Sequence, residues 1–318
     1  CSPWNLHLAT VMLTACYWNW LNRQSQQKHY PRILHPHGKI PDMQRKHCSS
    51  ALFLLLIVAC FSVILGQRGR YRSFPEPGQR INRRGIPDWE NDVQFKHDIF
   101  TFVRVRYSSW GQRNKWATDY PDSDLNFSFR LQQLTSLKVH PDGKVLSLTD
   151  KELFDYPFIY MVEPGELTLS EEEITVLRRY LLNGGFMMVD DFWGEREWEN
   201  FEQEILRVFP DRKIIDLPKE HEIFNCVYKL NDKPQVPSIG WAMRGRDLGI
   251  TWERPDAQEP HYRAILDDQQ QIIVMICHNT DLGDGWEREG EDEWYFREFS
   301  EKKAYPLGIN IVTYAMTH

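Results

Sequence analysis

Residues 158–191, FIYMVEPGELTLSEEEITVLRRYLLNGGFMMVDD, decide the fold of this chain. The stretch begins and ends with continuous apolar runs, at 158–162 and 186–189, which are typical of parallel strands covered on both faces. A capping box at 170–173 predicts the start of a helix between them, and Gly184 suits the left-handed end of that helix. A strand, a helix and a second strand in this order predict a right-handed crossover within a parallel sheet.

The alternation of strands and helices continues on both sides of this stretch. Residues 100–107 alternate apolar and polar side chains as a half-buried strand does, and Asp122 or Asp124 can cap a helix that follows. The later segments are a helix at 198–209, a third core strand at 213–216, an antiparallel hairpin at 262–266 and 271–277, and a helical segment at 294–316 interrupted near Pro306. We therefore predict an α/β domain with a mostly parallel central sheet, helices on both faces, and a C-terminal β-hairpin and helix.

Charge divides the chain into two unlike parts. The whole sequence has 38 basic and 45 acidic residues, a net charge of −7, and residues 1–66 contain six of the basic residues and one acid. Residues 67–318 therefore have 32 basic and 44 acidic side chains, a net charge of −12. Because nucleic-acid binding needs a basic face, we expect no nucleic-acid partner.

An apolar segment in the N-terminal part indicates export. Residues 51–65 are apolar except for Ser62 and follow a basic segment at 43–47. As a helix they would be about 22 Å long, which is short of the ~30 Å core of a bilayer, so 43–66 is interpreted as a signal peptide. The alternatives are an uncleaved membrane anchor and lipidation at Cys60. We expect a protein that is periplasmic or membrane-anchored at the cell envelope and meets the membrane only through this segment.

The remaining divisions follow from composition. Residues 1–42 show no sustained periodicity and are interpreted as a non-native or disordered extension. Residues 67–98 contain six arginines together with several prolines and glycines, which predicts an exposed linker. The folded domain is then expected at 99–318.

Three stretches of this domain closely resemble the bacterial domain-of-unknown-function 4159 family: WATDYPDSDLNFSFRLQQLTSLKV (116–139), DYPFIYMVEPG (155–165) and RRYLLNGGFMMVDDFWGEREWENF (178–201). The resemblance implies a relation to the class I glutamine amidotransferase-like superfamily, whose members are flavodoxin-like three-layer sandwiches. It also implies envelope partners of the MoxR-type ATPase and von Willebrand A-domain systems. It implies no activity, because one fold supports many functions.

The amidotransferase-like resemblance fails at the nucleophile. Those enzymes place a cysteine on a tight strand-to-helix turn, whereas residues 190–194, DDFWG, contain neither cysteine nor serine. Cys226 and Cys277 lie in apolar, strand-like runs, and neighbouring strand residues such as Cys277 and His278 point to opposite faces. Glutamine hydrolysis by that mechanism is therefore not expected. A Cys226–Cys277 disulfide is an alternative to two buried thiols.

Three acids follow predicted strands, where open parallel sheets bind their ligands: Glu163, Asp190 and Asp191. The adjacent carboxylates of Asp190 and Asp191 can hold a divalent cation, or one can act as a base whose pKa the other raises. Trp193 can form a wall of the same crevice. The alternative is that one aspartate caps the helix that begins near Gly194 while the other faces solvent.

A second polar group lies around the first predicted strand. Alternation places Arg104 and Arg106 on one face and Tyr107 on the other, and Asp119 and Tyr120 follow along the chain. These side chains can converge on the same crevice and bind an anionic or carbohydrate ligand. Structural salt bridges and a capped loop are the alternative.

An acidic segment near the C-terminus has seven acids between residues 281 and 293. It lacks the alternating ligand spacing of an EF-hand, so we interpret it as a solvated acidic loop. The sequence contains no Walker motif, dinucleotide-binding glycine pattern, zinc-type Cys/His spacing or HExxH motif, and no cofactor is expected.

These observations favour a non-catalytic ligand-binding or assembly module on an amidotransferase-like scaffold that lacks the nucleophile. The alternative is a carboxylate- or metal-dependent hydrolase acting on a carbohydrate or peptide-like substrate through Asp190, Asp191 and Glu163.

Overall fold

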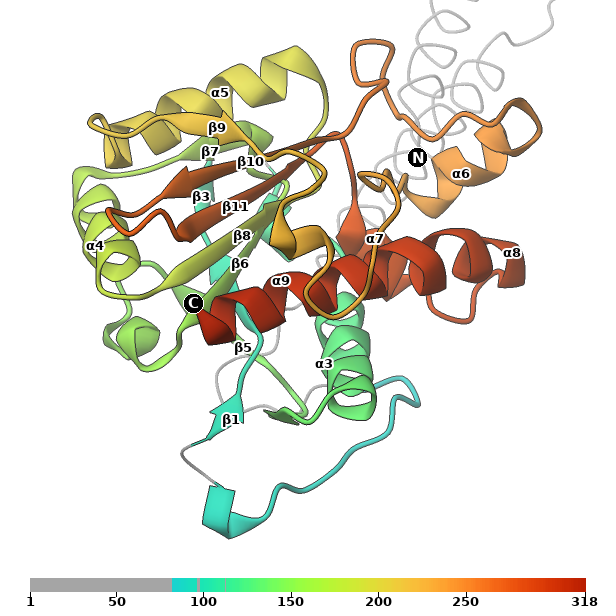
Figure 1. Ribbon diagram of the computed structural model, residues 1–318, viewed down its shortest axis with the longest axis horizontal. Helices are drawn as coiled ribbons and strands as arrows, with labels where there is room; N and C mark the ends of the chain where they lie inside the picture. Colours follow the sequence, from blue (N-terminus) through green and yellow to red (C-terminus); the bar gives the residue numbers. More distant parts are fainter. Residues whose placement is uncertain (1–81, 96–97, 112) are drawn as a thin grey trace, which may run out of the picture. The chain divides into compact units, whose positions relative to one another are not determined.

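A mixed sheet of seven strands forms the centre of the described part of the computed structural model (Figure 1). The strands are β2 (Val103–Arg106), β5 (Lys144–Ser147), β6 (Phe158–Val162), β8 (Phe186–Asp190), β9 (Ile214–Asp216), β10 (His261–Leu266) and β11 (Ile272–His278). They lie in the order β5-β2-β6-β8-β11-β10-β9, and the first five are parallel. Only β10 runs antiparallel to its neighbours β11 and β9, so the predicted mostly parallel sheet and hairpin are confirmed.

The structure describes residues 82–95, 98–111 and 113–318. The predicted extension at 1–42, the signal segment at 43–66 and the linker up to residue 81 lie outside the described residues. Within the described ranges, no helix is both long enough and apolar enough to cross a membrane.

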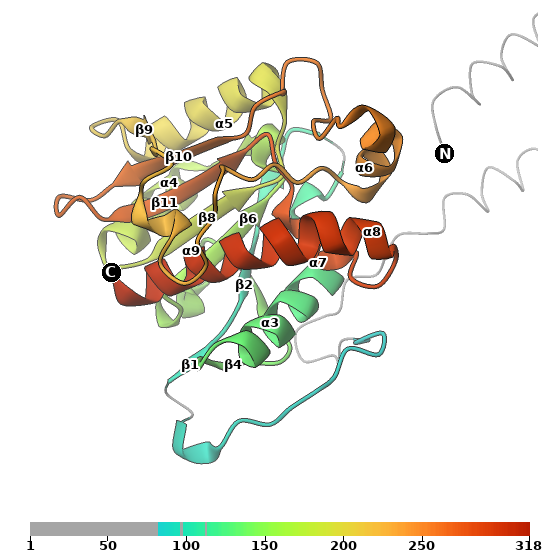
Figure 2. The ribbon, with the colours of Figure 1, turned by 45° about the vertical axis from the view of Figure 1, so that its right-hand side comes forward.

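Helices cover both faces of the sheet, with α4 and α5 on one side and α3 and α9 on the other (Figures 1 and 2). Alternate β6 residues such as Phe158 and Tyr160 pack in one cluster with Phe127 of α3 and Leu307 of α9. The intervening Ile159 therefore faces α4 and α5. The helices are α3 (Asp122–Leu134), α4 (Glu171–Leu182), α5 (Gly194–Val208), α6 (Ile239–Gly245), α7 (Leu282–Glu287), α8 (Glu293–Tyr295), the π-helix η7 (Phe296–Ala304) and α9 (Tyr305–Thr317).

Short elements connect these layers. Two small ladders pair β1 (Ile99–Phe100) with β4 (Lys138–Val139) and β3 (Ser108–Ser109) with β7 (Leu167–Thr168). The 3₁₀ turns are η1 (Val93–Phe95), η2 (Lys115–Ala117), η3 (Lys151–Asp155), η4 (Pro164–Glu166), η5 (Glu222–Phe224) and η6 (Arg246–Leu248).

The predicted crossover between β6 and β8 is present. The Ser170 hydroxyl accepts a hydrogen bond from the Glu173 amide (3.2 Å), and the Glu173 carboxylate accepts one from the Ser170 amide (2.9 Å). This capping box starts α4, and Gly184 adopts a left-handed conformation after its end (φ 91°). The chain leaves β2 toward β5 on one side and returns to β6 on the other, so the carboxyl ends of β2 and β6 form the place where such sheets bind ligands.

The predicted half-buried character of β2 is wrong, because this strand lies between β5 and β6 and is covered on both faces. Arg104 in its middle is fully buried and forms an ion pair with Asp124 (Nη2–Oδ1 2.6 Å). It also donates to the carbonyl oxygens of Trp116 (3.0 Å) and Thr118 (2.8 Å) and to the Ser123 hydroxyl (2.9 Å). Burial alone would lower the pKa of Arg104, but the Asp124 carboxylate outweighs it and raises that pKa, so the guanidinium stays charged in the core.

Substitution of Arg104 tests this buried ion pair. Arg104→Met leaves the Asp124 carboxylate buried without its partner, and we expect the free energy of unfolding to fall by about 3–5 kcal/mol in urea titrations. Arg297→Met, which removes the exposed i,i+4 pair with Glu301, should cost less than about 1 kcal/mol. The double variant Arg104→Met/Asp124→Leu should recover part of the loss. Equal losses for Arg104→Met and Arg297→Met would contradict the assignment.

Candidate metal centre

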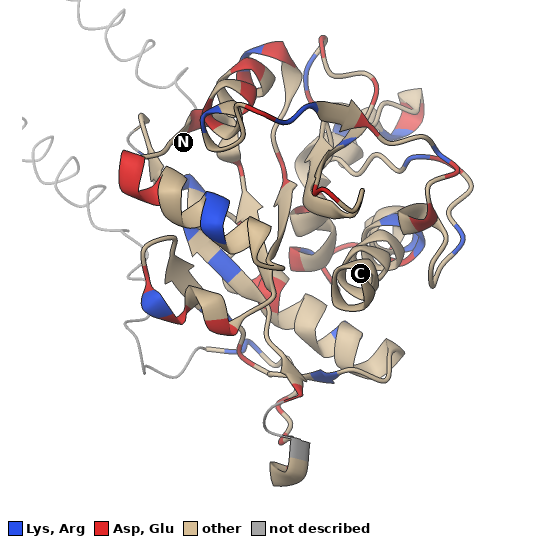
Figure 3. Cartoon of the chain, turned by 60° about the vertical axis from the view of Figure 1, so that its left-hand side comes forward, with Lys and Arg blue, Asp and Glu red and all other residues tan. Residues whose placement is uncertain are grey.

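Three carboxylates meet at the carboxyl edge of the sheet. Asp119, Asp191 and Asp281 each offer one oxygen, and the three oxygens lie within 4.8 Å of one another. The residues are 8%, 8% and 4% exposed. The acids and bases of the outer helices and loops are interspersed (Figure 3), so this buried concentration of one charge is a distinct feature.

Backbone conformation places these side chains. Asp119, between η2 and α3, and Asp191, directly after β8, both have left-handed backbones (φ 62° and 57°). Glu163, directly after β6, has φ 47°. Positive φ is uncommon outside glycine and is often retained at functional sites. Asp281 follows β11 and caps α7, since its carboxylate accepts a hydrogen bond from the Asp284 amide (2.7 Å).

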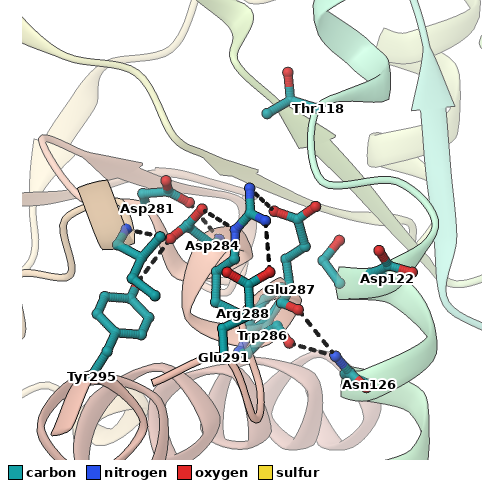
Figure 4. A network of polar contacts seen from close by, with 12 residues as sticks. Thr118, Asp122, Asn126, Asp281, Asp284, Trp286, Glu287, Arg288, Glu291 and Tyr295 are labelled. Atoms are coloured by element: carbon teal, nitrogen blue, oxygen red, sulfur yellow. Dashed lines mark hydrogen bonds and ion pairs between the residues drawn. The ribbon is translucent and has the colours of Figure 1, made fainter. Parts of the chain in front are cut away.

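The neighbouring acids have basic partners. Arg288 forms ion pairs with Asp284 and Glu287 (Figure 4), and Lys115 forms one with Glu163 (2.6 Å). In contrast, no ion pair within the described part of the chain involves any member of the first group: Asp119, Asp191 or Asp281. The three carboxylates therefore face one another without a compensating basic side chain.

The electrostatic consequence is a shift of all three acids toward their neutral forms. Burial is the main cause that raises the pKa of Asp119, Asp191 and Asp281 well above the ordinary value. The next cause is a nearby carboxylate in each case, from Glu287, Glu163 and Asp191 respectively. A cation among the three oxygens would remove both penalties.

The site also leaves space and an open ligand atom for a cation. Oδ2 of Asp119 is buried and accepts no hydrogen bond from the described residues. A Cβ atom built on Gly283 would lie 2.7 Å from this oxygen and 2.9 Å from the Tyr160 hydroxyl, so glycine keeps the space open. Three carboxylate oxygens are the donor set that Mg²⁺, Mn²⁺ and Ca²⁺ prefer.

Asp190 and Asp191, predicted as a joint ligand pair, have different surroundings. The Asp190 carboxylate accepts hydrogen bonds from the Tyr160 hydroxyl (3.1 Å) and the Gly283 amide (3.0 Å) beneath the centre. Burial raises the pKa of Asp190 to about 7. Only Asp191 belongs to the group of three, and its Oδ1 accepts a hydrogen bond from Nε1 of the buried Trp193 (3.1 Å).

The alternative interpretation, in which one of these aspartates caps α5, is wrong. The amide of Gly194 donates to Oδ1 of Asn279 (2.9 Å), and the amide of Glu195 donates to the Asp256 carboxylate (3.1 Å). Other residues therefore satisfy the start of α5, and neither aspartate faces solvent.

The second predicted group contributes one residue to the centre, Asp119. Arg104 is engaged in the core, and the exposed Arg106 places its guanidinium 5.0 Å from the centroid of the Trp116 ring. The Tyr107 hydroxyl donates to the carbonyl oxygens of Val162 (2.8 Å) and Glu163 (2.7 Å), and so joins the ends of β2 and β6. Tyr120 is buried, with its ring 5.8 Å from the Arg104 guanidinium.

The predicted solvated acidic loop is wrong at the three positions that matter here. Asp281, Asp284 and Glu287 are only 4%, 4% and 9% exposed. Sequence reasoning missed them because Leu282 and Trp286 anchor this segment as α7: the Trp286 ring packs 4.3 Å from that of Phe127 in α3. These two apolar residues, four apart among the acids, were the available signal.

Cys277 and His278 do not form a catalytic pair. Cys277 lies in the core cluster on the α9 side, whereas the His278 ring packs on Phe192 and Trp198 on the α5 side. Cys226 and Cys277 are both free thiols.

Comparison with known proteins agrees with the resemblance found in the sequence. Residues 101–316 match the family described as Domain of unknown function (DUF4159), and this range includes every carboxylate of the centre. Comparison with curated proteins gives no match.

A pH titration tests the surroundings of His278 beside the centre. Burial lowers its pKa to about 3, and the Arg263 guanidinium, 3.1 Å from Nδ1, contributes to the shift. Neutral His278 therefore contributes stability above pH ~6.5, and this contribution is lost as the pH falls from there toward 3. The free energy of unfolding should fall by about 1.4 kcal/mol more per pH unit in the wild type than in His278→Phe over this range.

The exposed His140 provides the control, since His140→Gln should leave the slope unchanged. Parallel curves for the wild type and His278→Phe would show that the imidazole is not held neutral.

Proposed function

This chain belongs to the DUF4159 family, and we propose that it is a divalent-cation-dependent hydrolase whose ligands are Asp119, Asp191 and Asp281. The substrate class that suits it is a carbohydrate or a peptide-like molecule. The observation that carries the proposal is the meeting of three buried carboxylates within 4.8 Å, without an ion pair to any described residue.

Water is the nucleophile that this arrangement favours. The turn after β8, residues 190–194, has no cysteine or serine that could attack a substrate. A cation held by three protein ligands keeps positions open for water and substrate, and it would polarise a bond or lower the pKa of water. Asp190, with a pKa near 7 and its Oδ1 without a hydrogen-bond donor in the described chain, is suited to hold a proton next to the centre.

The sheet supports a flavodoxin-like scaffold for this site. The order β5-β2-β6-β8 is the strand order 2-1-3-4 of such domains, and helices lie on both faces of the sheet. In these folds ligands bind at the carboxyl ends of the strands, which is the edge that carries Asp191 and Asp281. This order also supports the proposed relation to the amidotransferase-like superfamily.

A second candidate function is a non-catalytic assembly module in which the cation is structural. The enclosure of the centre favours it, because all three ligands are at most 8% exposed. A cation there would join three separate segments of the chain: the η2–α3 turn, the β8–α5 turn and the start of α7. MoxR-type ATPases and von Willebrand A-domain proteins at the cell envelope are the partners proposed for such a module.

Asp191→Asn is the sharpest test of cation binding. Asparagine keeps the acceptor for Trp193 and tolerates positive φ, but it removes one of the mutually repelling charges. In EDTA we expect the variant to be more stable than the wild type by about 1–2 kcal/mol. With Mn²⁺ added, the wild type should gain thermal stability and the variant should not.

Asp268→Asn, at a carboxylate that is 83% exposed, is the matched control and should change neither measurement. A wild type that binds no Mn²⁺, or an Asp191→Asn variant that gains as much stability from Mn²⁺ as the wild type does, would refute the cation site.

Turnover separates the two candidate functions. The Mn²⁺-loaded protein is incubated with p-nitrophenyl glycosides and peptide p-nitroanilides, and Asp190→Asn should lower hydrolysis at least tenfold without changing the affinity for Mn²⁺. Bound Mn²⁺ with no turnover on either series would favour the structural cation. Unchanged turnover in Asp190→Asn would remove the role given to Asp190.

We also propose export to the cell envelope with cleavage of the N-terminal segment. The sequence of 43–66 supports this proposal. Sequencing of the mature N-terminus from intact cells should find it after residue 60, and an N-terminus at Met43 or earlier would contradict cleavage.

A further inference from the structure

We propose that the centre contains a second cation position, formed by Asp119, Asp284 and Glu287, and that the Arg288 guanidinium fills it in the native protein. The inference rests on the proposed function, since Asp119 is shared with the first position. It follows that the wild type holds one divalent ion and that removal of the Arg288 charge opens a place for a second.

The geometry of the second group repeats that of the first. Asp119, Asp284 and Glu287 each offer one oxygen, and these oxygens also lie within 4.8 Å of one another. Asp119 belongs to both groups, so its carboxylate is placed to bridge two cations, as acids do in two-metal sites. Its Oδ2 is buried and receives no hydrogen bond from the described residues, which marks an open ligand position in the middle of the pair.

The contact between Asp119 and Glu287 points to the same conclusion. Their carboxyl groups are close enough to form a side-chain hydrogen bond. Two carboxylates can approach in this way only if they share a proton or if a cation lies between them. A second cation would take the place of that proton.

Arg288 provides the positive charge that is present now. Its guanidinium is paired with Asp284 (Nε–Oδ1 3.2 Å) and with Glu287 (Nη2–Oε2 2.7 Å), which are two of the three ligands of the second position (Figure 4). One diffuse charge can offset these two acids, but it does not reach the unpaired group of Asp119, Asp191 and Asp281. The two positions therefore differ in that only the second has an internal counter-ion.

The attachment of Arg288 allows it to be displaced. It follows the last residue of α7, its side chain is 32% exposed, and its outer partner Glu291 (3.0 Å) is 53% exposed. Asp284 keeps its other contacts without Arg288, because its Oδ2 accepts hydrogen bonds from the Ile239 amide (2.6 Å) and the Tyr295 hydroxyl (3.1 Å). The ligands of the second position are thus held independently of the guanidinium.

The test counts bound ions in the full chain. After loading with Mn²⁺ and desalting, elemental analysis should find one Mn²⁺ per wild-type chain and two per Arg288→Gln chain. Two Mn²⁺ ions bridged by Asp119 would lie about 3.5–4 Å apart, so Arg288→Gln should also show the electron paramagnetic resonance signal of a coupled pair. Arg130→Gln, which removes another partly buried arginine–carboxylate pair, is the control and should bind one ion.

Asp191→Asn distinguishes the two positions. In the wild-type background it should abolish Mn²⁺ binding, whereas in Arg288→Gln it should leave one ion at the second position. If Arg288→Gln does not fold, Arg288→Met keeps the apolar stem, removes the charge and should again bind two ions.

Three results would overturn this inference: two ions in the wild type, one ion in both Arg288→Gln and Arg288→Met, or two ions in the charge-retaining Arg288→Lys. No bound Mn²⁺ in the wild type would instead refute the proposed function on which the inference rests.

Discussion

The buried guanidinium of Arg104 is the interaction on which the rest of the site depends. It holds the carbonyl oxygen of Thr118 on one side of Asp119 and the side chains of Ser123 and Asp124 on the other. The turn between these contacts contains the left-handed backbone of Asp119, a conformation that costs free energy and persists only where surrounding contacts determine it. Arg104 lies in the middle of a strand covered on both faces, so the core of the sheet fixes the position of the shared ligand.

The centre itself opposes folding in the absence of a cation. Three buried carboxylates repel one another, and two of them have strained backbones. The domain offsets this cost with the apolar cluster in which Trp286 of α7 packs against α3 and the sheet. Such an arrangement, stable packing around a locally unfavourable group of charges, is typical of sites that bind a ligand of opposite charge.

Much of the fold could be predicted because local patterns agree with the final structure. The runs at 158–162 and 186–189 are buried strands, and the Ser170–Glu173 capping box starts the helix between them. Strand β5 (Lys144–Ser147) was missed because it is short and has a polar residue at each end, so neither alternation nor a continuous apolar run identifies it. Residues 100–107 were predicted as half-buried because alternation was taken to show an exposed face, whereas the alternating Arg104 is neutralised in the core by a partner twenty residues away.

The site was only partly predictable for a related reason. Asp190, Asp191, Glu163 and Asp119 were found by their places at strand ends or in a polar group, which is a property of the sequence. Asp281 was taken to be solvated because acids usually are, and its burial depends on the docking of α7 against α3, which connects residues far apart in the chain. The sharing of Asp119 between two groups of oxygens depends on backbone torsion angles and cannot be derived from residue order.

The turn after β8 shows how this scaffold can support a different chemistry from that of its proposed relatives. Asp190 continues the strand, and its carboxylate is held beneath the centre by Tyr160 and Gly283. The left-handed backbone of Asp191 then directs the next side chain into the group with Asp119 and Asp281. Since amidotransferase-like proteins use the corresponding turn to present a thiol nucleophile, this chain presents a carboxylate at the same edge of the sheet. A carboxylate that faces two others is a poor nucleophile, but it is a good ligand for a cation, so the change of residue at this turn favours catalysis by a metal-bound water over catalysis through a covalent intermediate.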